Sequence, residues 1–204
     1  MKPFTSFSLR ISIFSCILFL ITRFSIAQSS VPITISVFNE SVAIPFTQGF
    51  PTPIHPGMAV GTEIPTHQRT WSSTMVSVNL GYYFHKYLNQ ALFAQIGYGY
   101  EFRSKIGISS LVQMGVGYLH VIRNQPEYSL QDGKYTSSSG IGRSRLMIAP
   151  SVDIGFYLKP KKIQSGRIFV RYQPWVEYPF SSGFIPLLPH TNLHLVYKFY
   201  PFSK

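Results

Sequence analysis

The feature that most constrains this sequence is a strict alternation of apolar and polar residues, which runs from the end of the N-terminal segment almost to the last residue. In 73–85, for example, Val76 and Val78 fall on one face of an extended chain, and Ser77 and Asn79 fall on the other. A period of two is typical of β-strands with one apolar face, whereas an amphipathic helix needs a period near 3.6. The chain is therefore expected to be all-β.

Eight segments carry this alternation, six of them clearly and the first two more weakly. The expected strands are 31–46, 57–66, 73–85, 91–103, 106–121, 145–158, 167–178 and 192–202. Within the first strand the apolar parity switches near Asn39 and Glu40, which predicts a β-bulge there.

Composition indicates which face of the strands points inward. Only 12% of the residues are charged, against about 25% in ordinary soluble domains, and the polar faces are rich in Gly and Ser. A face exposed to water would carry more charges, whereas small residues and a few paired ions suit the interior of a narrow barrel. We therefore predict a single eight-stranded, antiparallel, up-and-down transmembrane β-barrel with its apolar face toward lipid.

Connection lengths favour the same fold. With both termini in the periplasm, the connections near 47–56, 123–143 and 181–190 face outward, and the shorter ones at 67–71, 104–105 and 159–165 face the periplasm. Long outer loops and short periplasmic turns are the rule for outer-membrane barrels.

The first 27 residues predict an export signal that is cleaved near Ala27. Basic residues precede an eleven-residue apolar run at 11–21, and small residues follow it. The run is too short to cross a bilayer as a helix, which needs about 20 residues. Cys16 is the only cysteine of the chain, so the expected barrel of residues 28–204 forms without disulfides.

Four segments carry a resemblance to a known family: HPGMAVGTE at 55–63, LGYYFH at 80–85, GVGYLH at 115–120 and VYKFYPF at 196–202. On these segments the chain resembles small eight-stranded bacterial outer-membrane β-barrel proteins of the outer-membrane-protein A barrel type. It is most similar to the outer-membrane β-barrel group common in Bacteroidota. The resemblance covers nearly all of the expected mature chain, although its motifs are structural and imply no chemistry.

The resemblance implies a place in the bacterial outer membrane, in contact with lipid and lipopolysaccharide, and insertion by the barrel-assembly machinery. Such barrels usually end on an aromatic residue that this machinery reads. Here Phe202 is followed by Ser203 and Lys204, which departs from that pattern.

One group of candidate site residues consists of ions on the polar strand faces. An eight-stranded barrel has an interior that is just filled by side chains. We therefore expect these residues to form an ion-pair network that fills the lumen rather than a wide pore or a catalytic site: Glu63, Glu101, Arg103, Arg145, Asp153, Arg171, Glu177 and Lys198.

A second group consists of histidines. The topology places His55, His85, His120, His190 and His194 at or near the outer rim, and His67 at the periplasmic end. Several neutral imidazoles at one rim could bind a transition metal. These histidines lack a metal-ligand spacing in the sequence, so neither a metal nor another cofactor is predicted.

An enzymatic role is not predicted either. Two barrel enzymes of this size act on lipid A, a deacylase and a palmitoyl transferase, and both need a hydroxyl or base beside a histidine and an acid. His85 shares a face with Ser73 and Ser77 but not a depth, and no His-x-Ser element occurs at His120 or His194.

The formal charge of +11 does not indicate nucleic-acid binding, because the basic residues are spread thinly and the longest cluster is the KPKK of 159–162. A basic surface facing anionic lipid explains the charge. In the expected strand 167–178, Pro174 and Trp175 predict a local distortion of the ladder, with a lateral opening for a lipid-like ligand as the functional alternative.

The sequence therefore predicts a monomeric outer-membrane barrel with a structural or interaction role and exposed outer loops. One alternative is a lipid-modifying or small-hydrophobe-binding barrel that uses the rim histidines. The second alternative, a soluble exported lipocalin-like barrel, is disfavoured because the Gly-x-Trp element is missing and the polar face carries too few charges.

Overall fold

The computed structural model describes residues 31–47, 53–124, 127–131, 134–138, 142–162, 164–181 and 185–201. The predicted export signal and the chain end at Phe202 lie outside the described residues. No helix in the described part of the chain is long and apolar enough to cross a membrane.

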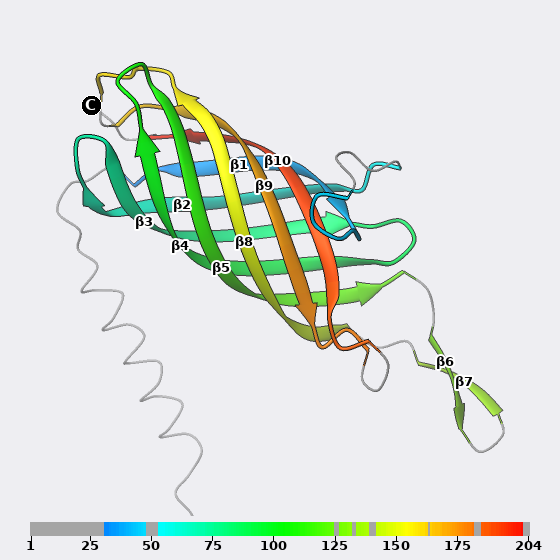
Figure 1. The fold of residues 1–204 in the computed structure, drawn as a ribbon. Helices are drawn as coiled ribbons and strands as arrows, with labels where there is room; N and C mark the ends of the chain where they lie inside the picture. Colours follow the sequence, from blue (N-terminus) through cyan, green and yellow to red (C-terminus); the bar gives the residue numbers. More distant parts are fainter. Residues whose placement is uncertain are drawn as a thin grey trace, which may run out of the picture. The chain divides into compact units, whose positions relative to one another are not determined.

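Eight antiparallel strands close into a barrel (Figure 1). They are β1 (Ile33–Ser41), β2 (Pro56–Gln68), β3 (Ser72–Phe84), β4 (Asn89–Arg103), β5 (Ile108–Arg123), β8 (Arg143–Tyr157), β9 (Arg167–Tyr178) and β10 (Leu188–Phe199). Each barrel strand pairs with the next along the chain, and β10 pairs with β1 to close the sheet. The predicted up-and-down barrel of eight strands is confirmed.

Two further strands, β6 (Glu127–Gln131) and β7 (Lys134–Ser138), form a separate two-stranded sheet within the connection between β5 and β8. The alternation in the sequence did not predict this hairpin, because each of its strands is only five residues long.

The two ends of the barrel differ in their connections. We call the end where β1 begins and β10 ends the termini end, and the opposite end the loop end. The two longest connections, 42–55 and 124–142, lie at the loop end, as expected. The 179–187 connection is no longer than the 158–166 connection at the termini end, because β10 begins at Leu188 rather than at the expected residue 192.

The apolar faces of the strands point out of the barrel, as predicted. The side chains of Val78, Ile96 and Val152 are 41%, 53% and 45% exposed, whereas Glu101 and Asp153 are 3% and 0% exposed. An all-β chain that buried its apolar face, as a lipocalin does, would show the reverse pattern.

The interior contains an apolar layer that the prediction of a polar lumen did not include. It lies in the half of the barrel nearer the loop end and consists of Phe38, Tyr83, Ala91, Phe93, Leu119, Val121, Met147, Ala149 and Trp175.

Glycines on the same inward face make room for this layer. Phe93 lies opposite Gly81 and Phe38 lies opposite Gly57. A Cβ at Gly81 would come within 2.3 Å of the Phe93 ring, and one at Gly57 within 2.2 Å of the Phe38 ring. The polar face is therefore rich in glycine partly because large inward rings lie across from it.

The predicted bulge near Asn39 and Glu40 is wrong. The pairing of β1 with β10 runs without a shift to the end of β1 at Ser41, so the change of parity marks the end of the strand. The observed irregularity lies in β2 between Pro65 and His67, where proline lacks the N–H that a regular ladder uses.

The distortion expected at Pro174 lies on one side of β9. Its pairing with β10 is continuous through Pro174, whereas its pairing with β8 is interrupted between the Ile148–Val176 and Val152–Tyr172 pairs. The flanking register places Pro150 opposite Pro174. Because neither proline has an N–H, this pair cannot exchange the two hydrogen bonds of a regular ladder.

Candidate functional site

The inward charges near the middle of the barrel centre on Arg171 of β9. Its guanidinium donates two hydrogen bonds of 2.9 Å to the Asp153 carboxylate, which lies opposite it in the register of β8 and β9. It donates a third, of 2.8 Å, to Glu63 of β2, whose other oxygen accepts from Lys198 Nζ at 3.1 Å. All four side chains are almost fully buried, so the network links β2, β8, β9 and β10 across the lumen.

A second group of charges lies nearer the termini end, around Glu101. Its carboxylate accepts hydrogen bonds from the Tyr157 and Ser73 hydroxyls, and Arg167 Nη1 lies 3.5 Å away. Arg167 is fully buried and also donates to Ser109 Oγ at 2.7 Å. Arg167 was not among the predicted network residues, although it lies on the polar face of the expected strand 167–178.

Arg103 was predicted to join these ion pairs, but it does not. As the last residue of β4 it lies at the barrel mouth, where Nη2 donates to the carbonyls of Pro160 and Lys162 at 2.6 and 2.9 Å. Its guanidinium lies 3.8 Å from the centre of the Tyr157 ring. Arg103 therefore fastens the 158–166 turn to the end of the barrel.

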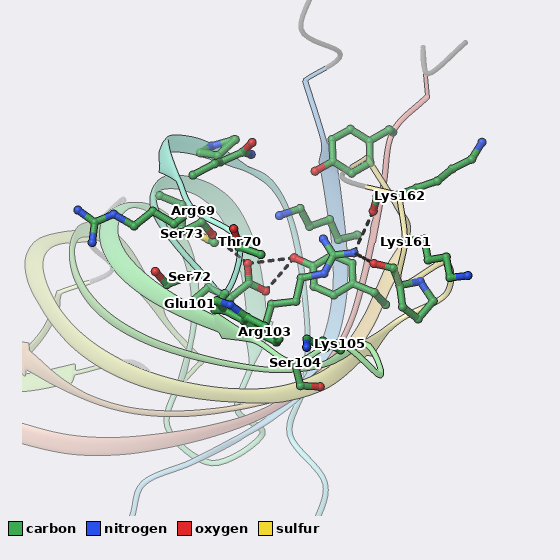
Figure 2. Close-up of a pocket in the computed structure, with 18 residues that line it drawn as sticks. Arg69, Thr70, Ser72, Ser73, Glu101, Arg103, Ser104, Lys105, Lys161 and Lys162 are labelled. Carbon is green, nitrogen blue, oxygen red and sulfur yellow. Dashed lines mark hydrogen bonds between the residues drawn. The ribbon is translucent and has the colours of Figure 1, made fainter.

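A basic cavity of about 590 Å³ opens at this end of the barrel (Figure 2). Glu101 is among the residues that line it, and its cations are Arg69, Arg103, Lys105, Lys161, Lys162 and Lys198. A concave surface with this charge attracts anions.

At the loop end, a chain of buried ionic contacts runs from β8 to β1. Arg145 pairs with Glu177, and His190 Nε2 lies 3.2 Å from the other Glu177 oxygen. His190 Nδ1 lies 2.7 Å from Glu40 Oε1, and its ring stacks on Trp175 with centroids 3.8 Å apart. Glu40 was not among the predicted network residues, although it lies on the polar face of the expected strand 31–46.

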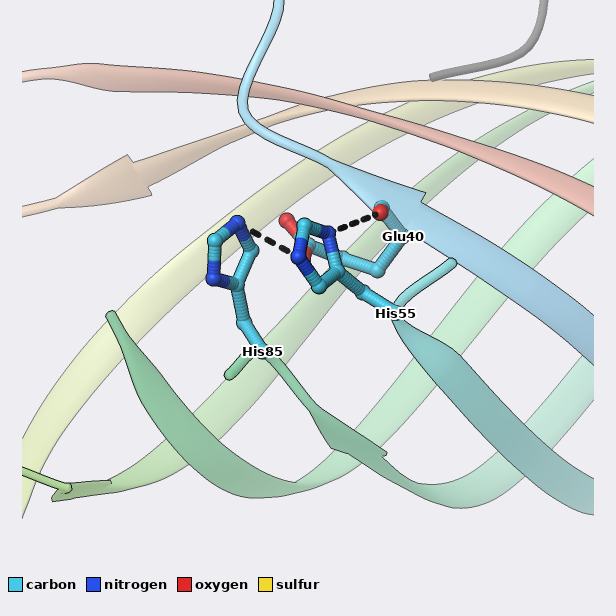
Figure 3. A group of neighbouring side chains, drawn as sticks. All are labelled: Glu40, His55 and His85. Atoms are coloured by element: carbon cyan, nitrogen blue, oxygen red, sulfur yellow. Dashed lines mark hydrogen bonds and ion pairs between the residues drawn. The ribbon is translucent and has the colours of Figure 1, made fainter. Parts of the chain in front are cut away.

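Two more histidines meet Glu40 from the connections that flank β2 and β3 (Figure 3). His55 precedes β2 and His85 follows β3, and their rings stack with centroids 3.6 Å apart. His85 Nε2 lies 3.9 Å from Glu40 Oε2. Burial lowers the pKa of the His85 imidazole below its usual value, although the nearby Glu40 carboxylate acts in the opposite direction.

The structure gathers only some of the predicted rim histidines. His55, His85 and His190 come together inside the loop end. His194 is a correction to the prediction: because β10 begins early, it lies midway along the strand, buried against the Phe38 ring. His67 lies at the termini end, where its Nε2 accepts a hydrogen bond from Arg69.

His120 faces outward rather than into the lumen. It lies opposite Ser144 in the pairing of β5 with β8. The hydroxyl of Tyr118 lies between them, 2.8 Å from Ser144 Oγ and 3.5 Å from His120 Nδ1. The sequence did not predict this contact, because Ser144 and His120 lie on different strands and only the register brings them together.

Glu40, His55 and His85 are also the residues best placed to hold a metal ion. Each offers one ligand atom, and the three atoms lie within 4.8 Å of one another. In the part of the chain that the structure describes, no other group of three histidine, cysteine or carboxylate ligands is as close.

Comparison with known proteins identifies the fold. No protein-family model and no curated protein matches the sequence. Neisserial surface protein A aligns with a TM-score of 0.50 at 7% identity, over 84% of this chain and 97% of that one. The outer membrane enzyme PagL aligns with a TM-score of 0.46 at 13% identity, over 82% of this chain and 98% of that one.

The attachment invasion locus protein Ail of Yersinia pestis aligns with a TM-score of 0.42 at 15% identity, over 83% of this chain and 97% of that one. These three proteins are outer-membrane β-barrels. The likeness to Neisserial surface protein A shows that this chain has the same fold, a closed eight-stranded antiparallel barrel, and at 7% identity it shows the fold alone.

Proposed function

We propose that this chain is an integral protein of the bacterial outer membrane, with a structural or interaction role and with its lumen closed to diffusion. Its loop end would face the surroundings, and lipid and lipopolysaccharide would cover its outer face. We expect a monomer without enzymatic activity and without nucleic-acid partners.

The outward apolar face is the observation that carries this proposal. The barrel strands are 9 to 16 residues long, and a membrane-spanning strand needs about 9–11. Exposed aromatic side chains ring both ends of the outer face: Tyr100, Phe102, Phe156 and Tyr197 toward the termini end, and Phe84, Tyr118 and Tyr178 toward the loop end. Two aromatic girdles flanking an apolar band are typical of outer-membrane barrels.

The packing of the interior supports a closed lumen. The Glu63–Arg171–Asp153 network fills the middle of the barrel, and the Glu40–His190–Glu177 chain lies at the loop end. The apolar layer around Trp175 lies between them. Side chains packed along the axis in this way would leave no open path for ions, as expected for a barrel of eight strands.

Planar-bilayer recording tests this proposal. The chain, folded in detergent and inserted into a bilayer, is expected to give no stepwise ion current. A heat-dependent shift of the protein on a gel would verify that the inserted barrel is folded. Regular open-channel steps from protein that passes this control would contradict the closed lumen, and folding without detergent or lipid would contradict the membrane location.

A lipid-acting hydrolase is the second candidate function, and the outward pair of His120 and Ser144 favours it. The Tyr118 hydroxyl lies between the Ser144 hydroxyl and the His120 imidazole, and a hydroxyl that can pass its proton to an imidazole is the arrangement of a base-activated nucleophile. The Tyr118–His120 edge also borders an apolar depression of the outer face, lined by Met58, Leu80 and Leu92 among others, where an acyl chain could lie.

Mass spectra of the membrane lipids separate the two candidates. Cells that produce the protein and cells that produce the Ser144→Ala variant are expected to have the same lipid acyl composition. If an acyl chain is lost only in cells with the unaltered protein, the hydrolase is supported and the structural role alone is refuted.

A further inference from the structure

The pairing of three neighbouring strands brings Glu40, His55 and His85 to one level of the loop end. Continuing the register of β1 and β2 past its last pair places Glu40 opposite His55, and continuing that of β2 and β3 places His55 opposite His85. The Glu40 N–H donates to the His55 carbonyl at 2.9 Å. The cluster is therefore built by the sheet itself and does not depend on a long loop.

Two polar atoms of this cluster are buried without a hydrogen-bond partner. Glu40 is fully buried, and its Oε1 faces His190 whereas its Oε2 has no partner within hydrogen-bond distance. His55 is 6% exposed, and its Nε2 is likewise unpaired. Leaving buried polar atoms unpaired costs free energy, so native proteins avoid it unless something else binds there.

We propose that Glu40 Oε2, His55 Nε2 and His85 Nε2 bind one divalent transition-metal ion of the zinc type. Two imidazoles and a carboxylate are a ligand set that such ions take in proteins, with a further position open to water. With metal–ligand distances near 2.1 Å, tetrahedral ligand atoms lie about 3.4 Å apart. One ligand atom from each of the three residues lies within 4.8 Å of the other two. Binding therefore requires the two stacked rings to turn apart until both nitrogens point at one ion.

The contacts around two of the three ligands, His55 and Glu40, already have the form that metal sites use. His55 Nδ1 lies 3.2 Å from the Glu40 carbonyl, so the ring proton is held at Nδ1 and the Nε2 lone pair is free. His190 holds the second oxygen of the Glu40 carboxylate at 2.7 Å. Partners of this kind orient metal ligands and strengthen binding.

The third ligand, His85, changes one contact on binding. The Tyr87 N–H lies 3.3 Å from His85 Nδ1, and coordination through Nε2 requires the ring proton on Nδ1. Metal binding therefore exchanges this long contact for a coordination bond. It ties the turn after β3 to the end of β1.

Titration of the detergent-folded protein with Zn²⁺ and Co²⁺ tests the site. We expect one ion per chain by calorimetry and elemental analysis, and Co²⁺ is expected to show the strong visible absorption of a four- or five-coordinate site. The His55→Ala and His85→Ala variants are each expected to weaken Zn²⁺ binding at least tenfold. His67→Ala, which removes an exposed histidine at the other end of the barrel, serves as the matched control and is expected to bind unchanged.

Three results would overturn the proposal: no Zn²⁺ bound by the unaltered protein, an octahedral Co²⁺ spectrum, or equal weakening by His67→Ala. The first two use only the unaltered chain, so they decide the question even if a ligand variant fails to fold. Heat-dependent gel mobility identifies such variants, and His85→Asn, which keeps a polar side chain in the turn after β3, then replaces His85→Ala.

Discussion

A few buried charged side chains hold together the strands that line the middle of this barrel. Arg171 contacts two carboxylates, Asp153 on the neighbouring strand β8 and Glu63 on β2 across the lumen. Neither carboxylate has a second guanidinium within salt-bridge distance among the described residues. Removing one partner of a buried ion pair lowers the free energy of unfolding by more than the intact pair adds to it, because the remaining charge stays buried without a partner. Arg171 is therefore the residue at which the network is most sensitive.

Replacing Arg171 by leucine is expected to lower the free energy of unfolding by about 3–5 kcal/mol, the range measured when one partner of a buried pair is removed. Urea unfolding in lipid vesicles, followed by tryptophan fluorescence, measures the change. Arg69→Leu is the control, since Arg69 is exposed and its side chain donates only to His67 among the hydrogen bonds described. A surface change of this kind is worth about 0.5 kcal/mol or less. Equal losses for the two variants would contradict the network.

At the scale of the strand, alternation and register contribute different information. Alternation is enough to place Glu63, Asp153 and Arg171 on the inward face, so their burial could be predicted. Which of them meet depends on register, and register depends on where strands begin and end. His194 illustrates the difference: an error of four residues in the start of β10 moved it from the rim to the middle of the strand.

Close pairing of β8 with β9 gives a test at this scale. A Cβ at Gly155 would lie 2.2 Å from the Ile168 carbonyl oxygen and 2.3 Å from Phe169 Cβ. Because backbone atoms cannot move aside as a flexible side chain can, Gly155→Ala is expected to cost about 1–3 kcal/mol of unfolding free energy.

Gly166→Ala is the matched control for Gly155→Ala. Its nearest neighbour would be the flexible end of Leu158, 3.1 Å away, so it should change stability much less. The same urea unfolding experiment compares the two, and a larger loss for Gly166→Ala would show that the spacing of β8 and β9 is wrong.

At the scale of the whole molecule, composition and alternation together predicted the orientation of the sheet. A chain with 12% charged residues has too few charges to cover a barrel in water, so the apolar face had to point outward. The apolar layer around Trp175 and the Glu40–His55–His85 cluster could not be predicted in this way. Both arise from cross-strand neighbours, which only the register brings together.

Spin labels on the outward face test this orientation most directly. The chain has one cysteine, Cys16, within the predicted export signal, so residues 28–204 can carry a single introduced cysteine. Labels at Val78, Ile96 and Val152 in lipid vesicles are expected to be relaxed by dissolved oxygen and shielded from a water-soluble nickel complex, whereas a label at the exposed Lys161 should show the reverse. If the nickel complex reaches all four labels equally, the outer face is in water and the account of a membrane barrel is contradicted.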